Sequence, residues 1–261
     1  MTSGTMTVDG GELAYEIRGS GSPVVLLHGG FLNGAMWDAQ VARFGRAHTV
    51  VRYDTRGHGR SSTPSGLFAH HEDLRVLLDG LGIARASVVG LSLGARTAID
   101  FGIAHPDRVD RLVLASPGIS GMAFRDPFVL EHMGRIGAAG SVEGAVECVL
   151  RAWVDGPHRA PEEVEPAVRE SCRAMMLDNF ARHRQAMTPS VQFGAIERVA
   201  ELVASTLLVV GDVDSTDIHG VADLVEASAA DARKVVVGGA GHVVNLERPE
   251  EFDREVLAFL G

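Results

Sequence analysis

The chain has 261 residues, of which 46% are hydrophobic and 22% charged, a composition typical of a globular protein with a full-sized core. Its formal net charge of -10 argues against nucleic acid or an anionic membrane surface as a partner, because both bind basic faces. Apolar runs fall short of the roughly eighteen residues that span a bilayer, and the opening MTSGTMTVDGG does not resemble a secretory signal, so we expect a soluble, cytoplasmic protein.

Seven segments are predicted to form strands. Residues 12–18 alternate in polarity and end at GSGSP, which predicts a half-buried hairpin strand followed by a turn. The six others are nearly continuous apolar runs, which are typical of strands buried on both faces of a sheet. They are VVLLH (24–28), TVVRYD (49–54), ASVVGL (86–91), RLVLAS (111–116), TLLVVGD (206–212) and KVVVGG (234–239).

Helical patterns separate these strands. Apolar residues recur at helical spacing around residues 71–83, 93–105, 219–229 and 249–260. Because strand and helix alternate along the chain, the sequence predicts the α/β class with a mostly parallel, doubly wound sheet.

The alternation breaks between about residues 118 and 200. Two amphipathic stretches, at 141–154 and 166–187, follow one another there without a strand-like run. Polar, proline-bearing residues 155–166 are predicted to form a loop between them. We interpret this region as a helical insertion.

Ser92 is the candidate nucleophile. It lies in Gly90-Leu91-Ser92-Leu93-Gly94, between a predicted strand and a predicted helix, which is the setting where a G-x-S-x-G serine sits at the apex of a strained turn. Glycines two residues to either side relieve the crowding of such a turn. An ordinary small residue in a strand-to-helix turn remains the alternative, because in a chain with 31 glycines roughly 0.2 such matches are expected by chance.

A serine nucleophile needs a base that is oriented by an acid. Catalytic groups of parallel α/β sheets gather at the carboxyl ends of strands, which selects His242 among eleven histidines because it directly follows the last strand. A surface histidine in a glycine-rich loop is the alternative interpretation. Asp212 and Asp214 both follow the strand 206–212; we favour Asp214 as the acid, and expect Asp212 to support the loop and Asp217 to cap the next helix.

Two backbone N–H groups are candidates for binding a developing oxyanion. Gly30 lies in a glycine-rich turn after the strand 24–28, and Leu93 opens the helix that follows Ser92, at the positive end of its dipole. His28 is interpreted as shaping the first turn, because a second base there would be redundant.

The segment 54–61, DTRGHGRS, is dense in charge and glycine. It offers one histidine near one aspartate without companion ligands, and it lacks the Lys-Ser/Thr ending of a phosphate-binding loop. We interpret it as a structural turn, and we expect neither a metal ion nor a cofactor.

Together these motifs closely resemble the α/β-hydrolase superfamily over nearly the full chain. The resemblance rests on HGG at 28, DTRGHGRSS at 54, GLSLGA at 90, GDVD at 211 and GHVVNLERPEEF at 241. Among subgroups the chain looks like the small capped esterases and lactonases, including the 3-oxoadipate enol-lactone hydrolases and the antibiotic methyl esterases. One departure is Ala95, where many relatives have a second glycine.

The resemblance implies the α/β-hydrolase fold, with a core domain of residues 1–118 and 194–261 and a helical cap of residues 119–193 over the site. It places the nucleophile, acid and base on Ser92, Asp214 and His242. It implies a cofactor-free serine hydrolase that cleaves a carboxylic ester or lactone of a small, largely apolar molecule through an acyl-enzyme. A serine at position 92 disfavours the dehalogenase and epoxide-hydrolase branches.

Two other functions stay open. Hydrolytic C–C cleavage of a diketone-like substrate would use the same three residues, and a ligand-binding, receptor-like relative would keep them with negligible turnover. The residue pattern identifies neither the substrate nor the oligomeric state.

Apolar side chains are expected to line the substrate pocket, although apolar residues at helical spacing mostly pack helices together. In the insertion the candidates are Met122, Phe124, Phe128, Met133, Trp153, Met175, Met176 and Phe180. The residues that we predict to bind substrate are Phe31, Phe124, Phe128, Trp153, Met176 and Val243.

Overall fold

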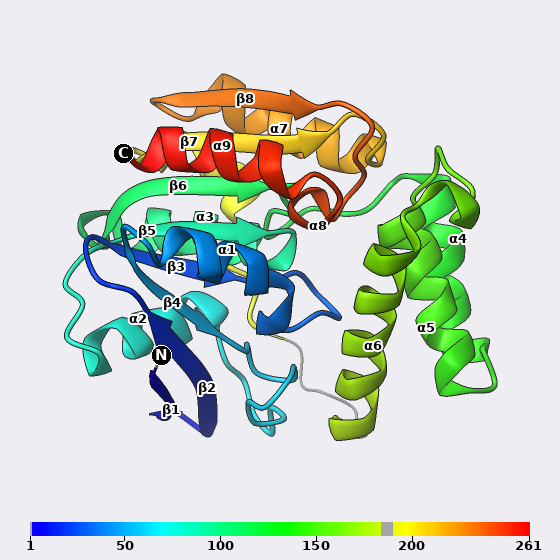
Figure 1. Cartoon of the computed structure of the whole chain (residues 1–261), viewed down its shortest axis with the longest axis horizontal. Helices are drawn as coiled ribbons and strands as arrows, with labels where there is room; N and C mark the ends of the chain where they lie inside the picture. Colours follow the sequence, from blue (N-terminus) through cyan, green and yellow to red (C-terminus); the bar gives the residue numbers. More distant parts are fainter. Residues whose placement is uncertain (1, 184–189) are drawn as a thin grey trace.

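In the computed structural model, which describes residues 2–183 and 190–261, one eight-stranded sheet organises the chain (Figure 1). The strand order is β1-β2-β4-β3-β5-β6-β7-β8. The strands are β1 (Thr2–Val8), β2 (Gly11–Arg18), β3 (Pro23–Leu27), β4 (Thr49–Tyr53), β5 (Ala86–Leu91), β6 (Val109–Ala115), β7 (Ser205–Gly211) and β8 (Ala232–Val237).

Most of the sheet is parallel. Neighbouring strands from β4 across to β8 pair in parallel, whereas β2 pairs antiparallel with both β1 and β4. The central strand β5 is buried along its whole length, as expected for a strand covered by helices on both faces. The predicted α/β class and mostly parallel sheet are confirmed.

Helices cover the two faces of the sheet (Figure 1). They are α1 (Asp38–Phe44), α2 (His70–Gly80), α3 (Leu93–Ala104), α7 (Thr216–Ser228), α8 (Val244–Glu247) and α9 (Pro249–Leu260). Two hydrophobic clusters result: Leu77 and Ile99 belong to the one under α2 and α3, and Phe44 and Phe252 to the one under α1 and α9. The sheet is therefore doubly wound.

The strand β1 and the helix α1 were absent from the prediction. Most side chains of β1 are exposed or half-buried, and only Val8 is fully buried, so the segment lacks the apolar run that marks the inner strands. It forms a hairpin with β2 in which Val8 lies opposite Gly11.

The insertion between β6 and β7 is helical, as predicted. It contains α4 (Pro127–Arg135), α5 (Val142–Leu150) and α6 (Pro166–Arg182). These helices stand beside the sheet at the end toward which the parallel strands point (Figure 1). The predicted helical stretch 166–187 is seen as far as α6 extends, and its residues 184–187 lie outside the described residues.

Candidate functional site

Ser92 lies at a strained turn between β5 and α3. Its φ of +54° is in the left-handed region that residues with side chains rarely adopt. A Cβ at Gly90 would lie 2.3 Å from the Gly94 carbonyl, and a Cβ at Gly94 would lie 2.1 Å from the Leu27 carbonyl oxygen. Both glycines are therefore required by close backbone approaches, for the steric reason that the sequence suggested.

Asp214 and His242 form a buried pair across two neighbouring strands. His242 Nδ1 lies 2.9 Å from Asp214 Oδ2, and the two residues are only 5% and 4% exposed. The pair forms where β7 and the loop after β8 approach closely, since a Cβ on Gly211 would lie 2.1 Å from the Ala240 carbonyl oxygen. Because the carboxylate occupies Nδ1, Nε2 is the ring nitrogen left for a reacting group.

The other two aspartates of this loop are placed differently. Asp212 is exposed. Asp217 lies in the first turn of α7 and accepts backbone N–H groups of Arg125 and Asp126, each at 2.9 Å. Asp217 thus ties the insertion to the loop of Asp214, and the prediction that it caps α7 is wrong.

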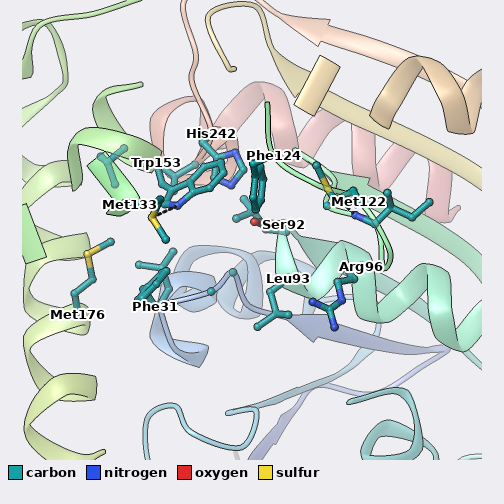
Figure 2. A pocket seen from close by; sticks show the side chains of 18 of the residues that line it. Phe31, Ser92, Leu93, Arg96, Met122, Phe124, Met133, Trp153, Met176 and His242 are labelled. Atoms are coloured by element: carbon teal, nitrogen blue, oxygen red, sulfur yellow. Dashed lines mark hydrogen bonds between the residues drawn. The ribbon is translucent and has the colours of Figure 1, made fainter. Parts of the chain in front are cut away.

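Ser92 and His242 both line a cavity of about 590 Å³ (Figure 2). Ser92 Oγ makes no hydrogen bond within the described ranges, and both side chains line the cavity. Its wall is mostly apolar and comes from both the core and the insertion. The predicted substrate-binding residues that line it are Phe31, Phe124, Trp153, Met176 and Val243, joined by Met122 and Met133.

Phe128 is a correction to the prediction. It is not among the lining residues, because its ring packs on the His132 ring, at 4.2 Å between centroids, and on the Arg151 guanidinium at 5.1 Å. Met175 and Phe180 are likewise absent from the wall, and pack in the hydrophobic cluster that also contains Phe44 and Phe252.

Trp153 stacks on His242. The ring centroids are 4.7 Å apart at a tilt of 39°, and Trp153 Nε1 donates to Met133 Sδ at 3.3 Å (Figure 2). Trp153 lies on a turn of π-helix, Arg151–Asp155, that continues α5. The fully buried carboxylate of Asp155 holds this turn through Arg151 at 3.0 Å and Arg169 at 2.9 Å. Such turns recur at functional sites, but the sequence carries no signal for one.

The loop after β3 presents one free N–H to the cavity. Phe31, at φ +63°, donates its N–H to His58 Nε2 at 3.2 Å. The Gly30 N–H has no acceptor in the described part of the chain, and Gly30 lines the cavity beside Leu93. The first-turn N–H of Leu93 likewise needs no partner within its helix.

Two buried, neutral histidines, His28 and His58, support this loop. Burial lowers the pKa of His28, partly offset by the attraction of Asp54, and burial lowers the pKa of His58 well below its ordinary value. His28 Nδ1 donates to the Gly29 carbonyl oxygen at 2.8 Å, and its Nε2 accepts the Thr55 N–H at 2.9 Å. His28 therefore shapes the turn, as interpreted from the sequence.

The segment 54–61 uses its polar groups within the protein. Asp54 accepts the N–H groups of Gly34 at 2.7 Å and Arg60 at 2.8 Å, and Arg56 pairs with Asp73. In residues 2–183 and 190–261 no group of three histidine, cysteine or acidic side chains is arranged to hold a metal ion.

Asn179, on α6, is a supporting residue that sequence reasoning missed. Its Nδ2 donates to the carbonyl oxygens of Phe31 at 2.7 Å and Leu32 at 2.9 Å, and its Oδ1 accepts the Gly59 N–H at 2.7 Å. The insertion thus holds the loop of Gly30 directly. A polar residue within a helix gives no signal of such contacts, because its partners are distant in sequence.

Comparisons with known proteins indicate one family, and the similar members have different activities. A family model described as "Alpha/beta hydrolase family" matches residues 24–255. The putative carbamate hydrolase RutD of Azorhizobium caulinodans is 28% identical, over 96% of this chain and 95% of its own length. The 2-hydroxy-6-oxo-6-phenylhexa-2,4-dienoate hydrolase of Comamonas testosteroni is 27% identical, over 94% of this chain and 90% of its own.

One solved structure similar to this chain is described as a lactone-degrading enzyme. Est816, described as an N-acyl homoserine lactone degrading enzyme, superposes with a TM-score of 0.79 at 28% identity, covering 98% of this chain and all of that one. Separately, none of the described helices is both long and apolar enough to cross a bilayer.

Proposed function

Because this chain belongs to the alpha/beta hydrolase family, as its motifs predicted, we propose that it is a serine hydrolase that cleaves a carboxylic ester or lactone of a small organic molecule. The observation that carries this proposal is the buried Asp214–His242 pair, 2.9 Å apart, whose histidine lines the same cavity as the strained Ser92. A nucleophile, a base and an orienting acid are then available at one place.

The proposed reaction has two halves. Ser92 Oγ attacks the substrate carbonyl while His242 Nε2 takes the hydroxyl proton, and the tetrahedral intermediate collapses as His242 returns that proton to the leaving alcohol oxygen. His242 then takes a proton from water, whose oxygen attacks the acyl-enzyme, and the acid leaves as Ser92 recovers its hydrogen. Asp214 orients the imidazole and stabilises its protonated form.

The backbone N–H groups of Gly30 and Leu93 are proposed to bind the oxyanion. His58 supports this assignment because it already engages the Phe31 N–H and leaves that of Gly30 for the substrate. Leu93 lies at the N-terminus of α3, where the helix dipole favours negative charge.

Residues 119–193 are proposed to act as a cap on a core of residues 1–118 and 194–261. Met133, Trp153 and Met176 come from this insertion and line the cavity, which supports the assignment. Their apolar surface would exclude bulk water and bind the apolar part of the substrate.

Hydrolytic C–C cleavage is the second candidate, favoured by the likeness to the dienoate hydrolase. It would use the same nucleophile, base and oxyanion donors. Product analysis separates the two reactions, because ester cleavage yields an acid and an alcohol, whereas hydrolytic C–C cleavage of a diketone yields an acid and a ketone.

The first test is intact-mass analysis after treatment with a fluorophosphonate, which labels serines activated in this way. We expect one adduct on the wild type and none on Ser92→Ala, while Ser65→Ala, which removes an exposed hydroxyl, keeps the adduct. An unlabelled wild type, together with stable retention of a ligand without product, would favour the binding-protein alternative.

A further inference from the structure

Among the described residues that line the mostly apolar cavity, one is an arginine. Arg96 lies on α3, four residues after Ser92, and is half-buried. Within the described ranges, no carboxylate oxygen lies within 4.0 Å of its guanidinium. Its one side-chain hydrogen bond there is from Nη2 to Ser190 Oγ at 3.2 Å.

Other arginines with little exposure are arranged differently. Each of four such residues has a carboxylate partner: Arg52 with Glu16, Arg56 with Asp73, Arg159 with Glu247 and Arg169 with Asp155. A guanidinium removed from water without an acceptor loses hydration that nothing replaces, so proteins usually pair it. Unlike these four arginines, Arg96 has no carboxylate partner among the described residues.

Asp100, the acid whose charge acts on Arg96, forms no ion pair with it within 4.0 Å. Asp100, one further turn along α3, accepts the hydroxyl of Ser120 at 2.5 Å, and burial raises its pKa to about 6. Burial also lowers the pKa of Arg96, an effect that the attraction of Asp100 only partly offsets. The guanidinium therefore keeps N–H donors for a group that enters the cavity.

We propose that Arg96 binds an anionic group of the substrate, so that the preferred esters or lactones carry a carboxylate close to the carbonyl that Ser92 attacks. This inference rests on the proposed hydrolase function. The Ser92 carbonyl oxygen accepts the Arg96 N–H at 2.9 Å, and both residues line the same cavity. An anion held by Arg96 would therefore lie a few bonds from the reacting carbon. A guanidinium suits a carboxylate because it donates two parallel hydrogen bonds.

The arrangement of side chains in the cavity also indicates where the apolar part of the substrate binds. Figure 2 shows Arg96 on one side of Ser92 and the side chains of Met133 and Met176 on the other. The substrate class is therefore an amphiphilic ester or lactone, with its carboxylate toward Arg96 and its apolar part toward the insertion.

The kinetic test compares charged and neutral substrates of similar size. One pair is the 4-nitrophenyl monoester of glutaric acid and 4-nitrophenyl pentanoate; the other is 3-carboxyphenyl butanoate and phenyl butanoate, which moves the charge to the alcohol. Wild-type protein should prefer the charged member of at least one pair in kcat/KM by about 10- to 100-fold, the range expected for a hydrogen bond between charged groups.

Variants assign that preference to Arg96. Arg96→Gln should abolish it while changing turnover of the neutral esters by no more than about threefold, and Arg96→Lys should restore part of it. Arg135→Gln removes an exposed cation of α4 and should leave both rates unchanged. An equal loss of both rates in Arg96→Gln, or a wild type without preference, would overturn the inference.

A binding measurement separates this inference from the proposed function. Calorimetry with glutarate needs no turnover: binding to wild type that Arg96→Gln weakens about tenfold or more supports the anion site even if Ser92 is inert. Equal affinity for the two proteins, or no binding to either, counts against the site even where Ser92 is labelled and hydrolyses neutral esters.

Discussion

The turn that presents Ser92 requires glycine at position 94, which has no side chain. Because a Cβ at Gly94 would lie 2.1 Å from the Leu27 carbonyl oxygen, Gly94→Ala should force the turn apart and lower the free energy of unfolding by about 1–3 kcal/mol, with loss of fluorophosphonate labelling. Chemical denaturation and intact mass measure the two effects.

The control is a second helical glycine. Gly220 lies exposed within α7 and a Cβ there meets nothing within 4 Å, so Gly220→Ala should raise stability by about 0.5–1 kcal/mol. If the two alanine variants shift stability in the same direction, the steric account of the turn is wrong.

Asp214 and Asp212 provide a matched pair for the acid. Asp214→Asn keeps the size of the side chain but removes the charge that orients His242, so kcat should fall by about 10³- to 10⁴-fold with the fold retained. The exposed Asp212→Asn should stay within about threefold of wild type. Steady-state kinetics on a neutral ester, with circular dichroism of each variant, decides whether the two positions have been assigned correctly.

Sequence gives its clearest proposals for residues that follow strands. Ser92, Asp214 and His242 could be proposed because the apolar runs show where strands end, and those ends share one edge of the sheet. Asn179 could not be found in this way, since its partners Phe31 and Leu32 lie 148 and 147 residues away. The prediction that Phe128 lines the pocket was wrong, because helical spacing does not show which face of a helix points into the cavity and which packs on other side chains.

At the scale of elements, strands with a continuous apolar run or a clear alternation were predicted, and β1 was not. The apolar run of β8 predicted the strand, but its expected burial on both faces was wrong, because β8 lies at the edge of the sheet and Val236 is 50% exposed. The inner strands carry continuous apolar runs, whereas β1 is an edge strand with mostly exposed side chains. A usable signal existed in Asp9-Gly10, since a two-residue turn of this kind favours a hairpin and Gly10 has φ +70°. The π-helical turn of Trp153 depends on Asp155 and its arginines, which only tertiary structure brings together.

The contact between α6 and the loop of Gly30 yields a prediction for a whole element. Asn179→Ala would leave the carbonyls of Phe31 and Leu32 without their donor, and should lower stability by about 1–3 kcal/mol. Because the loop loosens, kcat should drop about tenfold while KM changes less. Kinetics and urea unfolding should be compared with Asp178→Asn, whose exposed ion pair with Arg182 is expected to contribute little. A variant with normal kcat but lost stability would mean that Asn179 supports the fold alone.

For the whole molecule, buried neutral histidines predict sensitivity to acid. The pKa values of His28 and His58 are lowered by burial, and that of His70 is lowered to about 3, also chiefly by burial. Between pH 6.5 and about 3 the unfolded chain binds protons that the folded protein refuses, so stability falls as pH decreases. Asp100 acts in the opposite direction below pH 6, because its pKa is raised in the folded state.

Urea unfolding from pH 8 to pH 5 measures this effect. Each such histidine should contribute a slope of up to about 1.4 kcal/mol per pH unit below its unfolded pKa, and His70→Gln should reduce the slope by about that amount. Stability that stays level between pH 7 and pH 5 in the wild type would contradict the assignment of these histidines as neutral in the folded protein.

The hydrogen bonds of Asn179 also bear on how relatives of this chain diversify. An inserted segment that only roofed the cavity could be exchanged between family members as an independent module, carrying a new specificity with it. Here the same segment holds the loop beneath it, through the carbonyls of Phe31 and Leu32. A chimera that receives the insertion of a relative should therefore gain a new pocket, but its Gly30 loop should be poorly held. Turnover should recover only when an asparagine is restored at position 179.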